Sequence, residues 1–270
     1  MTKPFLRWVG GKTQLLPELL ARVPKKINRY YEPFVGGGAL FFALRPLRAH
    51  LSDSNAELMT TYRVVRDDVD MLIKFLRAIP YDKESYLKIR AEKLNNPVFA
   101  ASRMIYLNKA GFNGLYRVNQ KGEFNVPFGR TSSGEPPVVC DEESLRACSE
   151  ALWETSINSD DFSLALDRVG NGDFVYCDPP YAPASATANF TGYQAGGFGW
   201  AEQERLSAAA EALAARGALV MLSNADVPRV RELYAWASSV ERVEARRNVN
   251  SRGDKRGKVG ELIIRSWRDE

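Results

Sequence analysis

The residues whose types most clearly suggest chemistry are Asp178, Pro179, Pro180 and Tyr181, which directly follow an apolar run at residues 173–177. The run has the β-branched and aromatic residues of a buried parallel strand. Prolines donate no backbone hydrogen bond and fix φ, so we expect a rigid turn at the carboxyl end of that strand, where open α/β sheets bind ligands. A carboxylate, backbone carbonyls and an aromatic ring would suit a planar substrate with an amino group. The alternative is a tight turn in which the tyrosine is only packed.

A glycine turn is the second candidate site. Residues 29–35 predict a short strand, three glycines follow at residues 36–38, and residues 39–44 have a helical pattern. A strand, a glycine turn and a helix form the first unit of many nucleotide-binding folds, and glycines let the backbone approach a ligand. Because Phe41 occupies the sixth position of the G-x-G-x-x-G pattern, a nucleoside without a pyrophosphate fits better than a dinucleotide.

An acid follows the next predicted strand, residues 49–52. Asp53 lies about 15 residues after the glycine turn, somewhat closer than the roughly 20 residues usual for an acid that binds ribose hydroxyls. It could instead cap the following helix, and both roles are compatible.

Near the N-terminus, Gly10, Gly11 and Lys12 are similar to the end of a phosphate-binding P-loop. Leu6 stands where that motif requires a glycine, so a nucleotide triphosphatase is a weak alternative. We expect a loop that lets the backbone approach a ligand, with Trp8 and Lys12 facing that ligand. The other interpretation of the tryptophan is a packed core residue. Residues 13–22 then have a helical pattern.

Residues 57–101 are rich in charge, have a helical pattern broken at Pro80 and Pro97, and show no strand pattern, so we expect a helical insertion. Residues 108–130 interleave glycine, asparagine, aromatic and basic residues, with a hairpin turn predicted at residues 119–122. This segment has too little apolar periodicity to be core. Its residue types suit base edges, phosphates and stacking, although an ordinary solvated loop has a similar composition.

The rest of the chain completes an α/β pattern. We expect strands at residues 154–159, 218–223, 240–246 and 261–265, and a helix at residues 200–216 that ends before Gly217. The long loop at residues 182–200 is of a length that is usually functional or mobile. The loop at residues 246–258 is strongly basic and predicts either a phosphate clamp or a solvated hairpin tip.

Composition sets broad bounds. The chain has 270 residues, 45% of them hydrophobic, which allows one large domain or a core with an insertion. There is no apolar stretch near the roughly 20 residues needed to span a bilayer and no signal-like N-terminus, so we expect no membrane association and a cytoplasmic location. Cys140, Cys148 and Cys177 have no metal-like spacing, and the single histidine, His50, leaves no His-based triad or His-rich metal site. A net charge of +4 permits a nucleic-acid partner without requiring one.

Together the motifs resemble those of the Dam-type, or D12-class, DNA adenine N6-methyltransferases of the α group. The matching motifs lie at residues 7–12, 32–38, 53–55, 112–117, 124–130 and 178–181. They cover nearly the whole chain in the family's order of cofactor motif, recognition insert and catalytic motif. The resemblance implies an α/β fold with a Rossmann-like methyltransferase sheet, mostly parallel with a C-terminal antiparallel hairpin, and a helical target-recognition insertion. The catalytic domain would comprise residues 1–55 and 146–270, and the insertion, with its DNA-contacting hairpin, residues 56–145.

The resemblance also implies S-adenosylmethionine as the methyl donor, no metal, and double-stranded DNA as the partner. The candidate catalytic residues are Asp178, Pro179, Pro180 and Tyr181. The candidate cofactor-binding residues are Trp8, Gly10, Lys12, Glu32, Phe34, Gly36, Gly38, Asp53 and Asp178. The candidate DNA-binding residues are Arg7, Phe112, Asn113, Leu115, Arg117, Pro127, Arg130, Arg252, Lys255 and Arg256.

The implied reaction is methyl transfer to N6 of an adenine that has been flipped out of the duplex. The DNA-reading positions are similar to those of members that methylate GATC. Thr131 and Arg7 depart from the tyrosine and lysine usual there, so another short site of the restriction-modification type is the alternative. A non-catalytic DNA-binding protein is a further alternative, as is an enzyme for a protein amide or an RNA base. A restriction endonuclease partner is not readable from the sequence.

Overall fold

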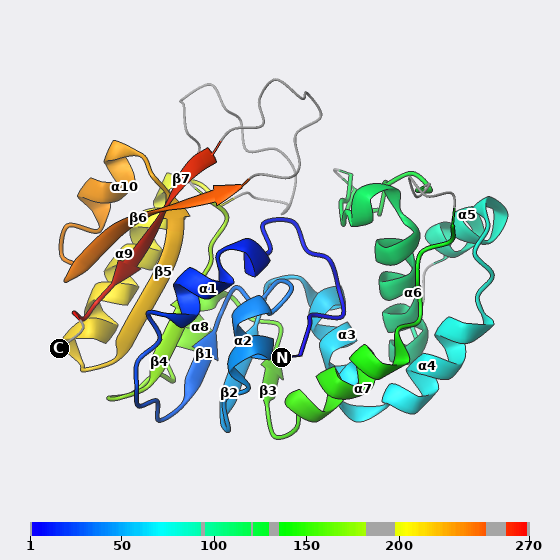
Figure 1. Cartoon of the computed structure of the whole chain (residues 1–270), viewed down its shortest axis with the longest axis horizontal. Helices are drawn as coiled ribbons and strands as arrows, with labels where there is room; N and C mark the ends of the chain where they lie inside the picture. The colour runs from blue at the N-terminus through cyan, green and yellow to red at the C-terminus, as the bar shows by residue number, and fades with distance from the viewer. Residues whose placement is uncertain are drawn as a thin grey trace. The chain divides into compact units, whose positions relative to one another are not determined.

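The computed structural model describes residues 2–92, 95–119, 121–129, 135–181, 198–246 and 258–268. The chain forms two compact units, each built from several segments (Figure 1). The first comprises Met1–Gly11, Gly36–Arg45 and Asp53–Ser159, and the second comprises Lys12–Val35, Pro46–Ser52 and Asp160–Glu270. The predicted boundaries of a catalytic domain and a recognition insertion stay a prediction, since a compact unit need not coincide with the part that performs one activity.

The second unit contains six strands of the sheet. They are β1 (Tyr30–Glu32), β2 (Ala49–Ser52), β4 (Phe174–Cys177), β5 (Leu219–Ala225), β6 (Ser239–Arg246) and β7 (Lys258–Arg265). They lie in the order β2-β1-β4-β5-β7-β6. The first four are parallel, with Tyr30 opposite Phe174 and Phe174 opposite Leu219, whereas β7 runs antiparallel to both β5 and β6. The predicted mostly parallel sheet with an antiparallel C-terminal hairpin is confirmed.

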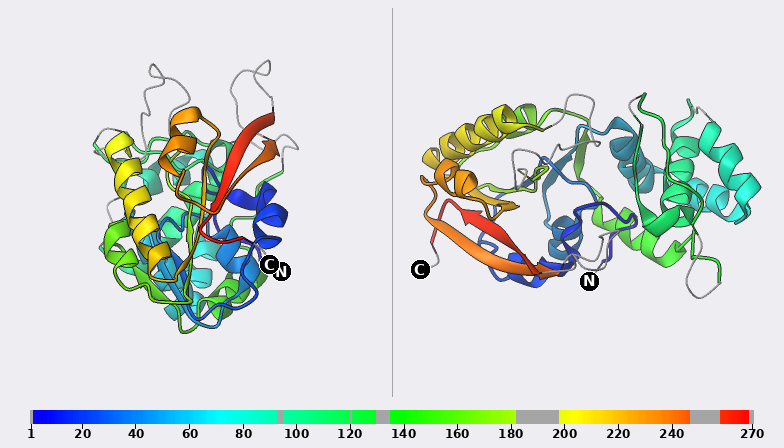
Figure 2. Two further views of the ribbon diagram at one scale, coloured as in Figure 1. Left: turned by 90° about the vertical axis from the view of Figure 1, so that its left-hand side faces the viewer. Right: turned by 90° about the horizontal axis from the view of Figure 1, so that it is seen from above.

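Apolar strands explain the core of this unit. All four residues of β4 are buried, as expected of a parallel strand covered on both faces. Helix α9 (Trp200–Ala215) packs along β5 (Figures 1 and 2). It contributes Leu206 and Leu213 to a cluster with Val175 and Leu222. Two shorter helices, α8 (Phe162–Leu166) and α10 (Pro228–Leu233), complete this side of the core.

One predicted helix in the second unit is interrupted. Residues 13–22 form a short 3₁₀ turn, η1 (Lys12–Gln14), and a five-residue helix, α1 (Leu16–Leu20). The physical reason is Pro17, which has no backbone N–H and is tolerated only in the first turn of a helix, so it starts a new helix.

The first unit is largely helical. Its elements are α2 (Ala39–Leu44), α3 (Ala56–Asp67), α4 (Val69–Ala78), α5 (Lys83–Ala91), α6 (Pro97–Ala110), η2 (Phe112–Gly114), α7 (Glu142–Ala151) and a short strand, β3 (Ser156–Asn158). Helix α3 packs against both α6 and α7. The predicted run of helices is therefore present. The predicted break of the helical pattern at Pro97 is present as well, because α5 ends at Ala91 and Pro97 opens α6, whose N-cap is the side chain of Asn96.

None of the helices in the described ranges combines the length and the apolar character that crossing a bilayer requires.

Candidate active site

The candidate catalytic turn, residues 178–181, leaves β4 at Asp178 and is organised by an ion pair within the second unit. The Nζ atom of Lys12 lies 2.9 Å from Oδ1 of Asp178. The same ammonium lies 4.4 Å from the centroid of the Tyr181 ring, a cation–π contact. Lys12 is buried, with 8% of its surface exposed. The sequence predicted a binding loop at this residue but did not reveal that its partner is Asp178. The pair holds the carboxylate against the aromatic ring.

The carboxylate of Asp178 is harder to ionise than an ordinary aspartate. Desolvation raises its pKa to about 6, the Lys12 charge opposes the rise, and the nearby Glu261 carboxylate adds to it. At neutral pH the group is therefore still mostly ionised and can accept hydrogen bonds. Desolvation and the Asp178 charge also raise the pKa of Tyr181, whose hydroxyl donates to Oε2 of Glu261 at 2.7 Å.

Two buried side-chain amides support the proline turn through consecutive hydrogen bonds. Nε2 of Gln203 donates to the carbonyl of Pro180 at 2.8 Å, and Nδ2 of Asn224 donates to Oε1 of Gln203 at 2.9 Å. Both amides are fully buried. Sequence reasoning missed Gln203, Asn224 and Glu261. The available signals were spacing and position, because Gln203 shares the buried face of α9 with Leu206 and Leu213, and Asn224 lies near the end of a buried strand.

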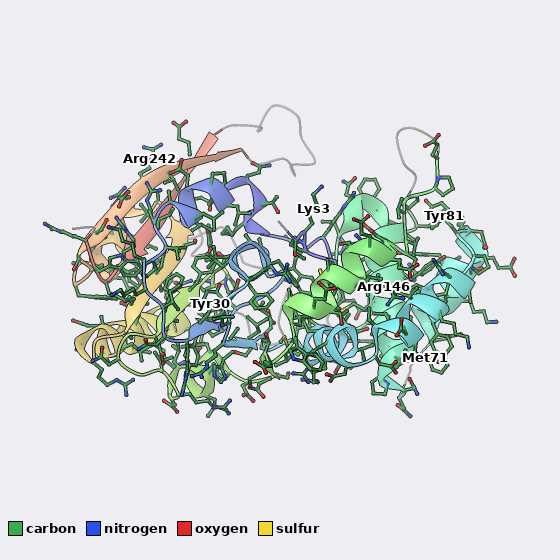
Figure 3. The ribbon with its side chains drawn as sticks, turned by 60° about the horizontal axis from the view of Figure 1, so that its bottom comes forward. Lys3, Tyr30, Met71, Tyr81, Arg146 and Arg242 are labelled. Carbon is green, nitrogen blue, oxygen red and sulfur yellow. The ribbon has the colours of Figure 1, made fainter. Side chains whose placement is uncertain are left out.

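Two predicted cofactor residues lie on or after β1. Glu32 is buried and accepts a hydrogen bond at 2.7 Å from the hydroxyl of Tyr30, which Figure 3 labels. The ring of Phe34 packs 5.4 Å from that of Phe162 and 5.6 Å from that of Phe198. Their roles toward a cofactor stay predictions.

The glycine turn lies in the first unit and requires glycine for two separate reasons. Gly36 and Gly38 have positive φ values of 46° and 67°. An added Cβ at Gly36 would come within 2.7 Å of the Trp8 ring, and one at Gly38 within 2.7 Å of the Tyr62 hydroxyl. The turn is therefore a close-packed cradle, and Trp8 is half-buried beside it rather than a deep core residue.

Asp53 holds this turn in place. Its Oδ2 accepts from the backbone N–H of Gly36 at 3.1 Å, and its Oδ1 accepts from that of Asn55 at 2.9 Å. Desolvation raises the pKa of the Asp53 carboxyl, while these two hydrogen bonds oppose the rise. The alternative that Asp53 caps the next helix is wrong, because the N-cap of α3 is Asn55, whose side chain accepts from Leu58. The ribose role stays a prediction.

The hairpin predicted around residues 119–122 is present, and its role in DNA recognition stays a prediction. Val118 bridges Phe124, and the N–H of Asn119 donates to the carbonyl of Glu123 at 2.8 Å. The expectation that this segment contributes nothing to the core is wrong, since Tyr116, Phe124 and Val126 are 8%, 7% and 1% exposed. The hairpin alternates inward and outward side chains, a two-residue period that the many polar residues obscured.

Five of the predicted DNA-reading residues are presented outward by this hairpin and by the loop after α6. Phe112, Asn113, Arg117 and Pro127 are exposed and Leu115 is half-buried. Arg117 donates from Nε to the side-chain oxygen of Asn125 at 2.7 Å, so its guanidinium is oriented before any DNA binds.

Arg7 is tied to the same loop through a residue that the sequence did not single out. Buried Asn108 accepts from the N–H of Arg7 at 3.0 Å and donates to its carbonyl at 2.8 Å. It also donates to the carbonyl of Gly114 at 3.1 Å. Gly10, another candidate, has a φ of 78° and open space around its Cα. The candidates Arg130, Arg252, Lys255 and Arg256 lie outside the described residues.

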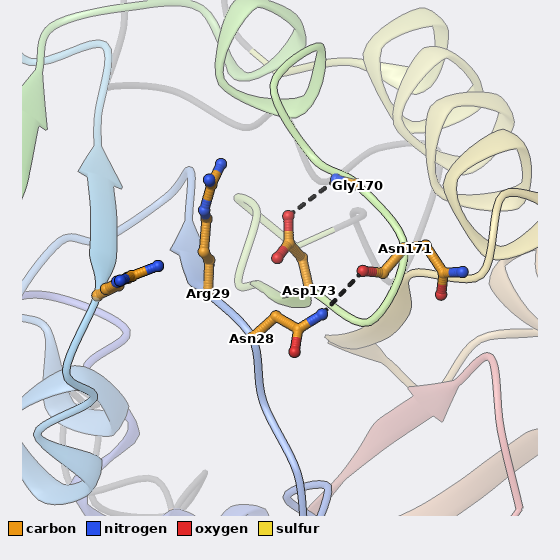
Figure 4. Close-up of a pocket in the computed structure, with 6 residues that line it drawn as sticks. Asn28, Arg29, Gly170, Asn171 and Asp173 are labelled. Carbon is orange, nitrogen blue, oxygen red and sulfur yellow. Dashed lines mark hydrogen bonds between the residues drawn. The ribbon is translucent and has the colours of Figure 1, made fainter.

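One pocket of about 430 Å³ lies elsewhere in the second unit (Figure 4). Its lining residues are Asn28, Arg29, Arg48, Gly170, Asn171 and Asp173. These residues precede β1, β2 and β4, so the pocket lies at the amino ends of the parallel strands, opposite the end that carries Asp178. In the described ranges no group of three or more His, Cys, Asp and Glu side chains is placed to hold a metal ion, and the expectation of a metal-free reaction stays a prediction.

Comparison with known proteins identifies the class. Residues 8–249 match the sequence model of the D12 class N6 adenine-specific DNA methyltransferase family. The chain is 40% identical to the type II methyltransferase M1.LlaDCHI of Lactococcus lactis subsp. cremoris, over 98% of this chain and 95% of that protein. It is 40% identical to the type II methyltransferase M.MjaIII of Methanocaldococcus jannaschii, over 98% and 99% of the two chains. It is 37% identical to the DNA adenine methylase of Escherichia coli K12, over 97% and 94%.

The fold, the catalytic turn and these matches define an α/β DNA methyltransferase. The chain belongs to the D12 class N6 adenine-specific DNA methyltransferases. It is an enzyme with adenine-specific DNA methyltransferase activity, and the family to which it belongs uses S-adenosylmethionine.

Proposed function

We propose that this enzyme methylates N6 of adenine within GATC in duplex DNA, and that it does so after flipping the target base out of the stack. The observation that carries the proposal is the catalytic turn, in which Lys12 holds the Asp178 carboxylate beside the Tyr181 ring. An ionised acceptor next to an aromatic face suits a base with an exocyclic amine. Because that amine is inaccessible in a stacked duplex, the base must leave the helix to reach these groups.

The residues present suit the proposed methyl donor. Glycine turns let the backbone approach a nucleoside closely, and this turn tolerates no Cβ at Gly36 or Gly38, because such an atom would meet Trp8 or Tyr62. The family's motifs assign to this donor the residues Trp8, Gly10, Lys12, Glu32, Phe34, Gly36, Gly38, Asp53 and Asp178. When bound, S-adenosylmethionine supplies an activated methyl group on a sulfonium.

The chain's own contribution to the chemistry is orientation and hydrogen bonding. The Asp178 carboxylate and the Pro179 carbonyl would accept hydrogen bonds from the N6 amine, which withdraws the nitrogen lone pair from the ring and frees it for attack. Tyr181 would stack on the flipped base. Gln203 and Asn224 keep the turn fixed from below, so these acceptors are pre-positioned before the substrate arrives.

Recognition of the site would lie with the outward face of the hairpin. Arginine is suited to the O6 and N7 atoms of guanine, and Arg117 is already oriented by Asn125. Leu115 and Pro127 would make apolar contacts, and Phe112 would stack on or wedge between bases. A second candidate is modification of a different short site, which is favoured by the two relatives at 40% identity that are named type II methyltransferases.

The test is transfer of labelled methyl from S-adenosylmethionine to two unmethylated duplexes, one with a single GATC and one with that site scrambled. Label on the first duplex alone would support both the reaction and the site. Label on both would keep the reaction and reject the roles given to Arg117 and Leu115. The variant Asp178→Ala should lose methyl transfer while retaining DNA binding, and turnover like that of the unmodified enzyme would reject the role of the carboxylate.

Base flipping is tested separately with 2-aminopurine in place of the target adenine. Its fluorescence is quenched in a stacked duplex and should rise when enzyme binds the first duplex. No rise on binding would reject flipping while leaving methyl transfer in place.

A further inference from the structure

A closed ring of contacts in the first unit joins the glycine turn to the recognition hairpin. It begins where the Trp8 ring packs against Gly36, so closely that a Cβ at Gly36 would come within 2.7 Å of it. The tryptophan ring also stacks on the Tyr116 ring, with centroids 5.0 Å apart and planes 23° apart. Since Trp8 and Gly36 are both candidate cofactor residues, this stack extends the cofactor cradle directly into the hairpin.

The closed ring of contacts continues through the carboxylate of Glu57. The hydroxyl of Tyr116 donates to Oε2 of Glu57 at 2.9 Å. Nη1 of Arg103 donates to Oε1 of the same carboxylate at 2.9 Å. Arg103 is fixed in turn by the carbonyls of Ile89 and Arg90. Both oxygens of Glu57 therefore accept hydrogen bonds, and Arg103 of α6 links this carboxylate to α5.

The helix that carries Glu57 closes the ring. Glu57 lies in the first turn of α3, whose N-cap is Asn55. The N–H of Asn55 donates to Asp53, and the other oxygen of Asp53 accepts from the N–H of Gly36. The path thus runs from Gly36 through Trp8, Tyr116, Glu57 and Asp53 and returns to Gly36.

The hairpin end of the ring lies between two reading residues. Tyr116 faces inward, and its neighbours Leu115 and Arg117 are the side chains proposed to read the DNA. Because a hairpin alternates its side chains, a shift of the Tyr116 backbone must re-aim both neighbours. The tyrosine hydroxyl is largely withdrawn from water, so separating it from Glu57 is unfavourable because it leaves poorly solvated polar groups unpaired.

We propose that Tyr116 and Glu57 are positioning residues that couple occupancy of the cofactor cradle to the presentation of Leu115 and Arg117. A cofactor that touches Trp8 and the Asp53 turn fixes one side of the ring and thereby orders the hairpin on the other. Coupling of this kind is reciprocal, so the cofactor strengthens binding of the correct site and the correct site strengthens binding of the cofactor by the same factor. The inference rests on the proposed function, since it assumes that both ligands bind as described there.

The experiment measures Kd for DNA rather than turnover, with S-adenosylhomocysteine as the cofactor probe because it occupies the cradle without reacting. The unmethylated duplex that serves as the enzyme's substrate and its scrambled counterpart are each titrated with and without the probe. For the unmodified enzyme we expect the probe to tighten binding to the substrate duplex about tenfold, within the usual range of allosteric coupling. We expect the affinity for the scrambled duplex to stay nearly unchanged.

Two matched tyrosine variants distinguish the effect of breaking this ring of contacts from the effect of losing any buried tyrosine hydrogen bond to the hairpin. Tyr116→Phe keeps the stack on Trp8 but removes the bond to Glu57. We expect its coupling to fall below about threefold, while its affinity for the probe without DNA stays within about twofold of the unmodified value. Tyr86→Phe also removes a buried tyrosine bond to the hairpin, from the hydroxyl to the carbonyl of Val126, but Tyr86 is outside the ring. It should retain the full coupling.

The outcomes are distinct. The inference would be overturned if coupling were unchanged in Tyr116→Phe, or if Tyr86→Phe lost as much coupling. It would also be overturned if the unmodified enzyme methylated DNA but showed no coupling. Each of these results would leave the proposed function standing. Absence of methyl transfer to either duplex would instead reject the proposed function. Thermal unfolding of both variants establishes that they are folded when their affinities are compared.

Discussion

Methyl transfer should fail in acid as Asp178 becomes protonated. The pKa of this carboxyl is raised to about 6, chiefly by desolvation. A group with that pKa is about nine-tenths ionised at pH 7 and about one-tenth ionised at pH 5. If the ionised form is the acceptor for the N6 amine, kcat/KM should fall about tenfold between these two values and continue to fall below pH 5.

Two charged neighbours of Asp178 allow the direction of the shift in its pKa to be tested. Lys12 lowers the pKa of Asp178 and Glu261 raises it. Lys12→Met should therefore move the acid limb to higher pH, by about 1–3 units for an opposite charge within contact distance. Glu261→Gln should move it to lower pH while keeping an oxygen that can accept from Tyr181.

The assay is single-turnover methyl transfer from pH 4.8 to 8 at subsaturating DNA, with the midpoint of the acid limb as the readout rather than the absolute rate. Loss of activity in a variant therefore does not obscure the result. DNA binding measured over the same pH range separates protonation of Asp178 from general weakening of the complex. A midpoint that stays in place in both variants, or moves opposite to the predicted directions, would refute the assignment of the limb to Asp178.

Three further predictions follow from single contacts. Gly38→Ala should lower the free energy of unfolding in urea by about 2–4 kcal/mol, because its φ is 67° and the new Cβ would meet a tyrosine hydroxyl at 2.7 Å. The matched change Gly122→Ala, at a φ of 76° with open space around it, should cost only about 1–2 kcal/mol. Gln203→Leu removes the donor to the Pro180 carbonyl and should lower kcat about 10- to 100-fold with little change in DNA affinity, as single-turnover rates and binding titrations would reveal. Arg117→Ala should reduce discrimination between correct and scrambled duplexes by about 1–3 kcal/mol in competition binding, and unchanged discrimination would exclude it from base reading.

Both candidate turns, at Asp178 and at the three glycines, were accessible from the sequence because their signals are local. A buried strand followed by an acid and two prolines predicted the turn at Asp178, and the strand at residues 173–177 exists as β4. The glycine turn and the helix after it were predicted for the same reason, since positive φ values at Gly36 and Gly38 select glycine directly. A local error arose at Pro17, which divides the single helix predicted over residues 13–22 into a 3₁₀ turn and a short helix.

The recognition segment was harder to predict because its pattern is short and its core contribution depends on distant partners. Tyr116 looked like one more aromatic residue in a polar loop. Its inward direction follows from the stack on Trp8 and the bond to Glu57, residues about 110 and 60 positions away along the chain.

By itself, the sequence determined the order of the motifs and the residue types that could accept an amine, because these depend on local patterns and on residue identity. The resemblance of those motifs to a known family implied the mostly parallel sheet with its antiparallel end. Only the tertiary structure decided which charges and amides meet. Lys12 pairs with Asp178 across 166 positions of chain, Gln203 supports Pro180, and Asn108 clamps Arg7. Such contacts carry no sequence period, because each joins elements brought together by packing of the core. They decide the charge that faces Asp178 and the side chains that support the backbone at Pro180 and Arg7.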